Sequence, residues 1–198
     1  RQRHDGRCPE RTGEAGAVSG GRLIGVGTGP GDPELLTLKA VKALGQADVL
    51  AHFAKRGNAG NARAIIKAHA RPDWIELPLL YPVTTEIDKN DGAYKGQILD
   101  FYEESATAIA RHLEAGRTVA VLSEGDPLFY GSYMHLHVRL AHRFPTEVIP
   151  GITAMSGCWS QVGLPLVQGD EILTVIKMAS VMSIHSCSLG APILLEEA

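Results

Sequence analysis

From residue 22 onward, short apolar runs alternate with longer segments whose apolar positions recur at helical spacing. The runs have the composition of buried strands, and the segments between them keep apolar residues near i, i+3 and i+4. Such alternation is typical of an α/β domain with a mainly parallel sheet. It predicts strands at 23–27, 48–52, 74–77, 118–123 and 147–149, and helices at 33–44, 61–70, 93–115, 131–142 and 153–162.

The predicted helix 93–115 shows the helical pattern most clearly. Its apolar stripe consists of Ile98, Phe101, Tyr102, Ile109 and Leu113. Charged residues such as Glu103 and Arg111 lie off this stripe, and Gly116 follows the helix as a C-cap. The connection before it, 77–94, contains prolines and is long, and loops of more than about 12 to 15 residues are uncommon unless they are functional. We therefore expect this connection to form a flap.

A glycine-rich loop follows the first predicted strand, in the stretch GRLIGVGTGPGDPELLTLKA at 21–40. A dinucleotide-binding loop needs free N–H groups and a positive dipole end at the start of the next helix. Here Asp32 occupies the N-cap, Pro33 has no N–H, and Glu34 adds a second negative charge. No Gly-Lys-Ser or Gly-Lys-Thr of a P-loop follows either. The pattern therefore predicts a stiff ligand-binding turn that disfavours a polyphosphate.

Two further loops share this character. SEGDPLFYGS at 123–132 follows the fourth predicted strand, and IPGITAMSG at 149–157 follows the fifth. The carboxyl ends of parallel strands lie at one edge of an open α/β sheet, where ligands bind. Loops with exposed backbone groups and few long side chains suit an uncharged heterocycle and an amino acid head group.

The order of four motifs, GVGTGPGDPELLTLKA, ADVL, SEGDPLFYGS and VIPGITAMSG, resembles the tetrapyrrole (corrin/porphyrin) methylases. These are the S-adenosylmethionine-dependent enzymes of corrin and siroheme synthesis. Within the family, FAKRGNAGNARA, LPLLYPVTTE and GCWSQVGLPLVQGDEILTV are similar to the members that methylate precorrin-2 at C20. The resemblance covers about residues 21–175 and implies this reaction, an early step of cobalamin (vitamin B12) biosynthesis.

The resemblance also implies site residues and partners. S-adenosyl-L-methionine would contact Pro30, Gly125, Asp126, Pro127, Thr153 and Ala154, at the family's motif positions. Tyr130 and Tyr133 could each either pack in the core or line a flat substrate site, and the sequence favours neither. The partners implied are a small-molecule tetrapyrrole and a second copy of the chain in a homodimer. The acid–base residue, and whether the substrate carries cobalt, stay open.

The sequence departs from the family at two places. Relatives with other substrates carry an aspartate after the second strand, where His52 and Phe53 stand here. Beyond residue 176 nothing resembles the family's second α/β domain, so we expect that domain to be mostly missing and Ile172, Leu173, Val175 and Ile176 to form a strand without its sheet. The predicted organisation is a disordered tail (1–20), an N-terminal α/β methylase domain (21–168) and the start of a truncated second domain (169–198).

Truncation leaves alternatives to the methyltransferase open. The chain could be a non-catalytic fragment or binding module of the same fold, or a methylase acting on another precorrin. A nucleotide-binding Rossmann protein is a third alternative, against which the Asp-Pro start of the first predicted helix argues.

The composition argues against two classes of partner, nucleic acids and membranes. The chain has 198 residues, a net charge of −3 and 6% aromatic residues, so it has neither a basic stripe nor a stacking platform for nucleic acid. Its apolar runs fall short of the roughly 20 residues that span a bilayer, so we expect no membrane association. Cys8, Cys158 and Cys187 are far apart, as is typical of a reducing cytoplasm.

Several polar residues have an ordinary structural explanation. Asp32 and Asp126 each precede a proline, where a carboxylate usually caps a turn or helix. His135 and His137 point apart on a helix, so we predict no metal site. Three further residues also have an ordinary structural explanation. Cys158 on an apolar helix is expected in the core, and the Lys55–Arg56 pair is expected in solvent rather than on substrate carboxylates.

Overall fold

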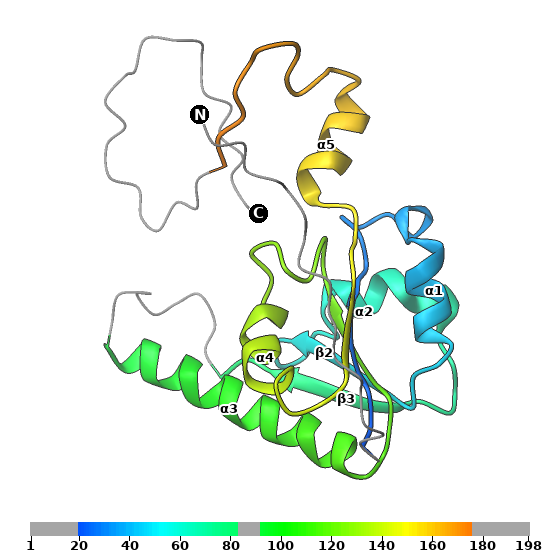
Figure 1. The fold of residues 1–198 in the computed structure, drawn as a ribbon, viewed down its shortest axis with the longest axis vertical. Coiled ribbons are helices and arrows are strands. Elements are labelled where there is room, and N and C mark those ends of the chain that lie inside the picture. The colour runs from blue at the N-terminus through cyan, green and yellow to red at the C-terminus, as the bar shows by residue number, and fades with distance from the viewer. Residues whose placement is uncertain (1–19, 83–91, 176–198) are drawn as a thin grey trace, which may run out of the picture. The chain divides into compact units, whose positions relative to one another are not determined.

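A computed structural model describes residues 20–82 and 92–175 of the chain (Figure 1). In these residues a five-stranded sheet has the order β3-β2-β4-β1-β5, and every pairing in it is parallel. The strands are β1 (Leu23–Gly27), β2 (Val49–Ala54), β3 (Ile75–Leu80), β4 (Val119–Ser123) and β5 (Thr146–Ile149). The predicted α/β class with a mainly parallel five-stranded sheet is confirmed. The predicted tail up to residue 19, the central part of the predicted flap (83–91) and Ile176 lie outside the described residues.

The helices follow the strands as expected, but two of them are divided. They are η1 (Pro33–Leu35), α1 (Leu38–Leu44), α2 (Asn61–Ile65), η2 (Ile66–His69), α3 (Gly92–Glu114), α4 (Tyr133–Leu140) and α5 (Ala154–Val162). The predicted helix 33–44 is a 3₁₀ turn followed by α1, because Leu36 adopts an extended conformation between them. Thr37 then caps α1, its hydroxyl accepting from the Ala40 N–H at 3.1 Å. The predicted helix 61–70 likewise ends as the 3₁₀ helix η2.

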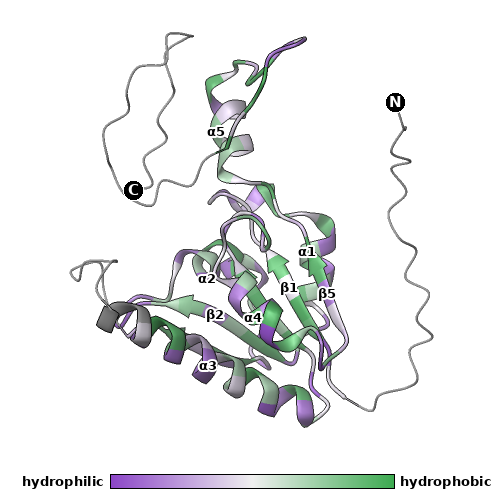
Figure 2. Cartoon of the chain, turned by 60° about the vertical axis from the view of Figure 1, so that its left-hand side comes forward, coloured by the Kyte–Doolittle hydropathy of each residue, from purple (hydrophilic) through white to green (hydrophobic). Residues whose placement is uncertain are grey.

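Helices cover both faces of the sheet: α1 and α2 lie on one side, and α3 and α4 lie on the other (Figure 1). Because side chains alternate along a strand, neighbouring residues of β1 enter different cores, Leu23 with α3 and α4 and Ile24 with α1. All residues of β1 and β4 are buried. Figure 2 shows β1 as mainly hydrophobic and α3 as alternating between hydrophobic and hydrophilic residues, as a helix covering one face of a sheet should.

The order of the strands brings three loops to one edge. β4, β1 and β5 are neighbours and run in parallel, so the loops that follow them begin side by side at the carboxyl edge. These are the three glycine-rich loops that the sequence singles out. Gly116 follows α3 at a φ of 79°, which a glycine C-cap adopts readily.

The chain divides into two compact units, residues 1–164 and 165–198. In the described part of the second unit, 165–175, the backbone makes a turn in which the Glu171 N–H donates to the Gln168 carbonyl at 3.1 Å. The expected strand at 172–175 is wrong: these residues have no regular structure, and Ile172 is 88% exposed. An isolated strand has no partner to satisfy its backbone groups.

Candidate functional site

Hydrogen bonds join the loop after β1 to the loop after β4. The backbone N–H and the hydroxyl of Thr28 both donate to the Ser123 carbonyl, at 2.9 and 3.1 Å. One residue further on, Gly29 and Gly125 exchange backbone hydrogen bonds of 3.4 and 2.8 Å. The parallel pairing of β1 and β4 thus continues as a short antiparallel bridge between their loops.

Asp126 joins the loop after β4 to the loop after β5. One of its carboxylate oxygens accepts from the Leu128 N–H at 2.9 Å, and the other accepts from the Gly151 N–H at 3.1 Å. Both oxygens therefore hold backbone groups, in agreement with the capping interpretation of this aspartate. Asp32 acts in the same way within its own loop, accepting from the Glu34 N–H at 2.8 Å.

Glycines let the three loops touch. A Cβ atom on Gly151 would lie 2.0 Å from the Gly125 carbonyl oxygen, and one on Gly27 would lie 2.5 Å from the Gly151 nitrogen. Contacts that short exclude any side chain at either position. The loops after β1, β4 and β5 thus form one packed unit, which we call the loop rim (residues 27–32, 123–131 and 150–154).

The loop rim contains all six residues predicted to contact the methyl donor. A Cβ atom on Gly125 would lie within 4 Å of Thr153 and Ala154, and one on Gly157 of α5 would meet the ring of Pro30 at 2.7 Å. The Thr153 hydroxyl caps α5 by accepting from the Ser156 N–H at 3.3 Å. Pro127 is buried, whereas the other five residues are at least partly accessible. Their contact with a ligand stays a prediction.

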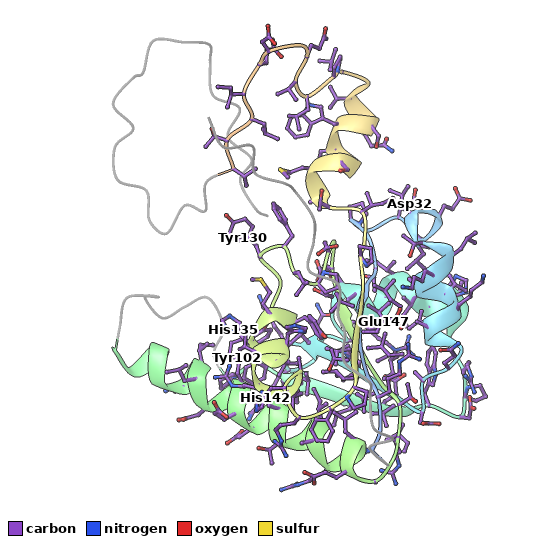
Figure 3. All side chains as sticks on the ribbon, in the orientation of Figure 1. Asp32, Tyr102, Tyr130, His135, His142 and Glu147 are labelled. Carbon is purple, nitrogen blue, oxygen red and sulfur yellow. The ribbon has the colours of Figure 1, made fainter. Side chains whose placement is uncertain are left out.

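The two tyrosines predicted at the substrate site occupy different environments. Tyr130 lies on the loop between β4 and α4, is 49% exposed and has a φ of 54°, unusual for a residue other than glycine (Figure 3). Tyr133 is fully buried: its ring packs on Gly25, and its hydroxyl lies 3.3 Å from His137 Nδ1. This burial raises the pKa of Tyr133. Its full burial agrees with the core-packing alternative for Tyr133, and contact of either tyrosine with a substrate stays a prediction.

Other side chains singled out in the sequence lie apart from the loop rim. Cys158 is exposed, so its expected place in the core is wrong: it lies on the outer side of α5, whereas Gly157 faces Pro30. His135 stacks on Tyr102 with 4.2 Å between ring centroids, where α3 meets α4 (Figure 3). Within residues 20–82 and 92–175, no group of three or more histidine, cysteine, aspartate or glutamate side chains could hold a metal ion. Lys55 and Arg56 are both exposed.

Next to the loop rim is a cavity of about 370 Å³. It is lined by Pro30, Gly31, Pro33, Asn61, Ala64, Ile65 and Glu124. The Asn61 amide donates to the Glu124 carboxylate at 3.4 Å and so joins the start of α2 to the loop after β4. The sequence pattern did not identify the α2 residues of this cavity, because nothing in their spacing shows that α2 begins beside that loop.

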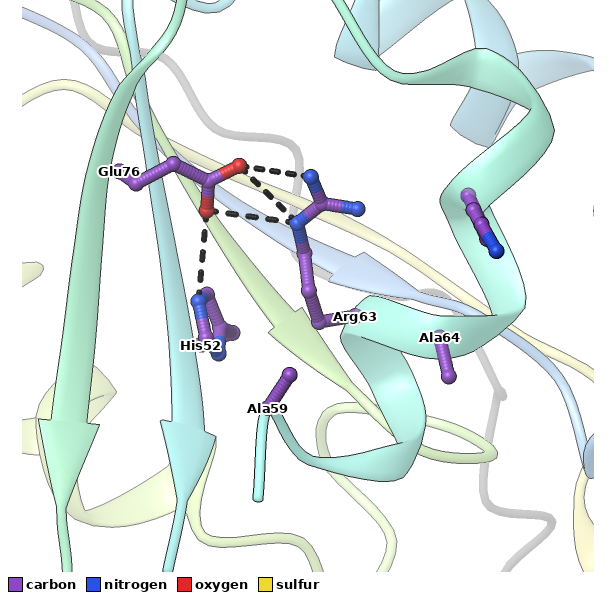
Figure 4. Close-up of a pocket in the computed structure, with 6 residues that line it drawn as sticks. His52, Ala59, Arg63, Ala64 and Glu76 are labelled. Carbon is purple, nitrogen blue, oxygen red and sulfur yellow. Dashed lines mark hydrogen bonds and ion pairs between the residues drawn. The ribbon is translucent and has the colours of Figure 1, made fainter. Parts of the chain in front are cut away.

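A second cavity, of about 480 Å³, lies between α2 and strands β2 and β3 (Figure 4). Three charged or ionisable side chains meet in it: Glu76 lies 3.3 Å from His52 Nε2 and accepts from Arg63 at 2.7 to 3.3 Å. In the sequence, His52 stands out only as a departure from the family. The alternation of β2 places His52 on the same face as the core residue Leu50, so the strand pattern could have indicated a buried histidine.

Comparison with known proteins decides the family. The family model of the tetrapyrrole (corrin/porphyrin) methylases matches residues 22–186, most of the chain. The chain belongs to this family. Among curated proteins, it is 78% identical over 159 residues to the precorrin-2 C(20)-methyltransferase of Sinorhizobium sp. It is 50% identical over 156 residues to the cobalamin biosynthesis protein CobIJ of Mycobacterium bovis.

A solved tetrapyrrole methylase has the same fold. The native form of uroporphyrin III C-methyl transferase from Thermus thermophilus is 30% identical, with a TM-score of 0.52, and the match covers 76% of this chain and 55% of that one. The matches to these two curated relatives cover 80% and 79% of this chain but 65% of the Sinorhizobium protein and 31% of the mycobacterial one. In the part of the chain that the structure describes, no helix of this family member is both long and apolar enough to span a membrane.

Proposed function

We propose that this chain belongs to an S-adenosylmethionine-dependent methyltransferase that methylates precorrin-2 at C20 in cobalamin biosynthesis. The observation that carries the proposal is the 78% identity to the Sinorhizobium enzyme of that activity. At that level of identity the residues that select a substrate are expected to be shared. The loop rim supports it, since its three loops meet at the edge where open α/β sheets bind ligands.

The loop rim fits the methyl donor better than a nucleotide with several phosphates. Its backbone is held in place by hydrogen bonds within the chain itself, those of the Gly29–Gly125 bridge and of Asp126. Asp32 and Glu34 place negative charge where a pyrophosphate would lie. We propose that Pro30, Gly125, Thr153 and Ala154 contact S-adenosyl-L-methionine, with Asp126 and the buried Pro127 holding the loop beneath it.

The donor supplies an already activated sulfonium methyl group. The chain's own contribution would be to align the substrate carbon with that group and to exclude water, for which rigid loops are suited. The exposed ring of Tyr130, paired with Phe129 at 5.0 Å between centroids, is the proposed contact for the flat substrate.

The wider organisation is also part of the proposal. We propose a tail at 1–20, a methylase domain at 21–168 and the beginning of a second domain at 169–198. The whole protein would act in the cytoplasm as a homodimer. The boundary at 168 lies close to residue 164, where the first compact unit ends.

Calorimetry tests the binding step. S-adenosylhomocysteine should bind to the chain, and NAD should not. Transfer of a labelled methyl group from S-adenosylmethionine to precorrin-2 then tests the reaction. Binding without transfer would indicate the alternative of a binding module. Transfer to a different precorrin would indicate another methylase of the family, and binding of NAD alone would contradict the proposal.

A further inference from the structure

The cavity next to the loop rim adjoins the proposed donor site. Pro30 and Gly31 of its lining belong to the loop after β1, Glu124 belongs to the loop after β4, and Asn61 begins α2. Pro30 is a proposed contact of the methyl donor, and Glu124 directly precedes another such contact, Gly125. An inference about this cavity therefore rests on the proposed function and refines it.

Both polar side chains of the cavity are accessible to a ligand. Asn61 and Glu124 are exposed, and the apolar part of the lining includes Pro30, Pro33 and Ile65. Small-molecule sites are typically lined by apolar side chains, with a few polar groups that fix the orientation of the ligand. The cavity has this composition, and its polar groups come together at the Asn61–Glu124 hydrogen bond.

Glu124 is the carboxylate of the loop rim that makes no bond to the backbone. Asp32 and Asp126 both accept from backbone N–H groups. Within residues 20–82 and 92–175, the Glu124 carboxylate accepts only from the Asn61 amide, at 3.4 Å to Oε2. So long a hydrogen bond between exposed side chains stabilises the fold little. The other oxygen, Oε1, is left to accept from a ligand.

The charge of the loop rim restricts what this ligand can be. Residues 27–32, 123–131 and 150–154 contain Asp32, Glu124 and Asp126 but no lysine, arginine or histidine. A phosphate or carboxylate group would therefore be repelled at Glu124. Since a carboxylate only accepts hydrogen bonds, the group that meets it has to donate them. Hydroxyl groups of a ligand meet both requirements.

A ribose supplies two adjacent hydroxyls. A carboxylate has about four acceptor positions, so the bond from Asn61 leaves enough for both of them. In dinucleotide-binding α/β proteins a carboxylate binds a ribose hydroxyl in this way. The cavity has about 370 Å³, toward the small end of the roughly 300–1,000 Å³ of small-molecule sites. Its size suits a nucleoside better than a whole tetrapyrrole.

We propose that Glu124 binds the ribose hydroxyls of S-adenosyl-L-methionine in this cavity, and that Asn61 holds the carboxylate in position. The ribose then lies beside Pro30, on the α2 side of the loop rim. The role of Glu124 is to bind and orient the donor.

Calorimetry with the full chain tests this contact. S-adenosylhomocysteine and its 2′-deoxyribose analogue differ by one hydroxyl, and the analogue should bind about tenfold more weakly. E124Q keeps the shape of the side chain but removes its charge, and should weaken S-adenosylhomocysteine binding about tenfold. In E124Q the two ligands should differ by about threefold at most, because the same bond cannot be lost twice.

Two further variants show whether the effect is local. Glu34 is exposed in the turn after the first loop and does not line the cavity, so E34Q removes a matched charge and should leave the binding of both ligands unchanged. N61A should weaken S-adenosylhomocysteine binding about threefold and the deoxy analogue less, since Asn61 acts through the carboxylate. An equal loss in E34Q and E124Q would reduce the effect to general charge and overturn the contact.

5′-Methylthioadenosine separates the ribose from the amino acid group of the donor, which it lacks. E124Q should weaken its binding by the same factor, and unchanged binding would assign Glu124 to the donor's ammonium group and overturn the ribose contact. If E124Q bound S-adenosylhomocysteine as tightly as the unaltered chain, this inference would fail and the proposed function would stand. If the unaltered chain did not bind S-adenosylhomocysteine, both would fail.

Discussion

Asp126 shows how a single side chain organises the proposed donor site without being free for chemistry. Its two carboxylate oxygens accept from Leu128 and Gly151 in two different loops. An amide in its place keeps one acceptor and turns its other end, a donor, toward an N–H group. We expect D126N to lower the free energy of unfolding by about 1–3 kcal/mol, since hydrogen bonds to a charged group are lost.

Urea unfolding measures this effect, with D32N as its control. Asp32 makes the same kind of bond to Glu34, but within an exposed turn of its own loop, so D32N should cost about 1 kcal/mol at most. S-adenosylhomocysteine binding should weaken in D126N and not in D32N. An equal loss of stability in both variants would show that Asp126 does no more than cap a turn.

Gly151 is a second residue on which the loop rim depends. A Cβ atom here would lie 2.0 Å from the Gly125 carbonyl oxygen, which belongs to backbone that is itself hydrogen-bonded. Overpacking at such a contact usually costs about 1–3 kcal/mol, and we expect G151A to lie at the upper end. Thermal unfolding should show a lowered midpoint.

A glycine in open space provides the comparison for G151A. Gly96 lies in α3, where a Cβ atom would have no neighbour within 4 Å, and its φ is not positive. Alanine is a better helix former than glycine by about 1 kcal/mol, so G96A should raise stability slightly. If G151A were as stable as G96A, the loops would not be in the close contact described.

At the scale of elements, the start of α1 decides whether residues 33–44 form one helix or a 3₁₀ turn followed by a shorter helix. The sequence predicts a helix from residue 33, and the structure places α1 at Leu38–Leu44 behind a separate 3₁₀ turn. Thr37 caps α1, and Asp32 caps only the turn. T37A should therefore cost about 1 kcal/mol, and D32A should cost less. Helicity by circular dichroism and urea unfolding check both, and a larger effect of D32A would favour one continuous helix.

The same elements show what the sequence could predict. The order of strands and helices follows from the sequence because short apolar runs alternate with segments whose apolar residues recur at helical spacing. The strand β1 has the predicted bounds, because its residues are buried on both faces and form a continuous apolar run. The division at Leu36 is harder to predict, since Pro33 and Thr37 are both acceptable helix starts. Tyr133 is the clearest limit: the spacing of α4 fits either core packing or a substrate site, and only the position of Gly25 beneath the ring decides.

At the scale of the whole molecule, the loop rim could be predicted from the sequence, whereas the cavity beside His52 could not. Each loop of the loop rim is a continuous motif that follows a strand, so parallel strand order alone brings the three together. The cavity beside His52 joins residues of β2, α2, η2 and β3 that are scattered along the sequence. Its geometry depends on β3 pairing with β2 at the edge of the sheet, in a register that hydrophobic pattern alone does not specify.

The buried His52 also predicts how stability of the whole chain depends on pH. Its folded-state pKa is lowered from 6.5, mainly by burial, although Glu76 faces it together with Arg63 and Lys67. Below pH 6.5 the unfolded chain binds a proton at this position that the folded chain resists. The free energy of unfolding should therefore fall as the pH drops from 7 toward 5.

Urea unfolding at several pH values in this window tests the effect. The decrease should be shallower in H52Q, which has no ring to protonate. It should not vanish, because burial and Arg117 also lower the pKa of His112. The carboxylates of Asp73 and Glu147, whose pKa values are lowered by their cationic neighbours, contribute only at more acidic pH. The same slope in H52Q as in the unaltered chain would contradict the assignment to His52.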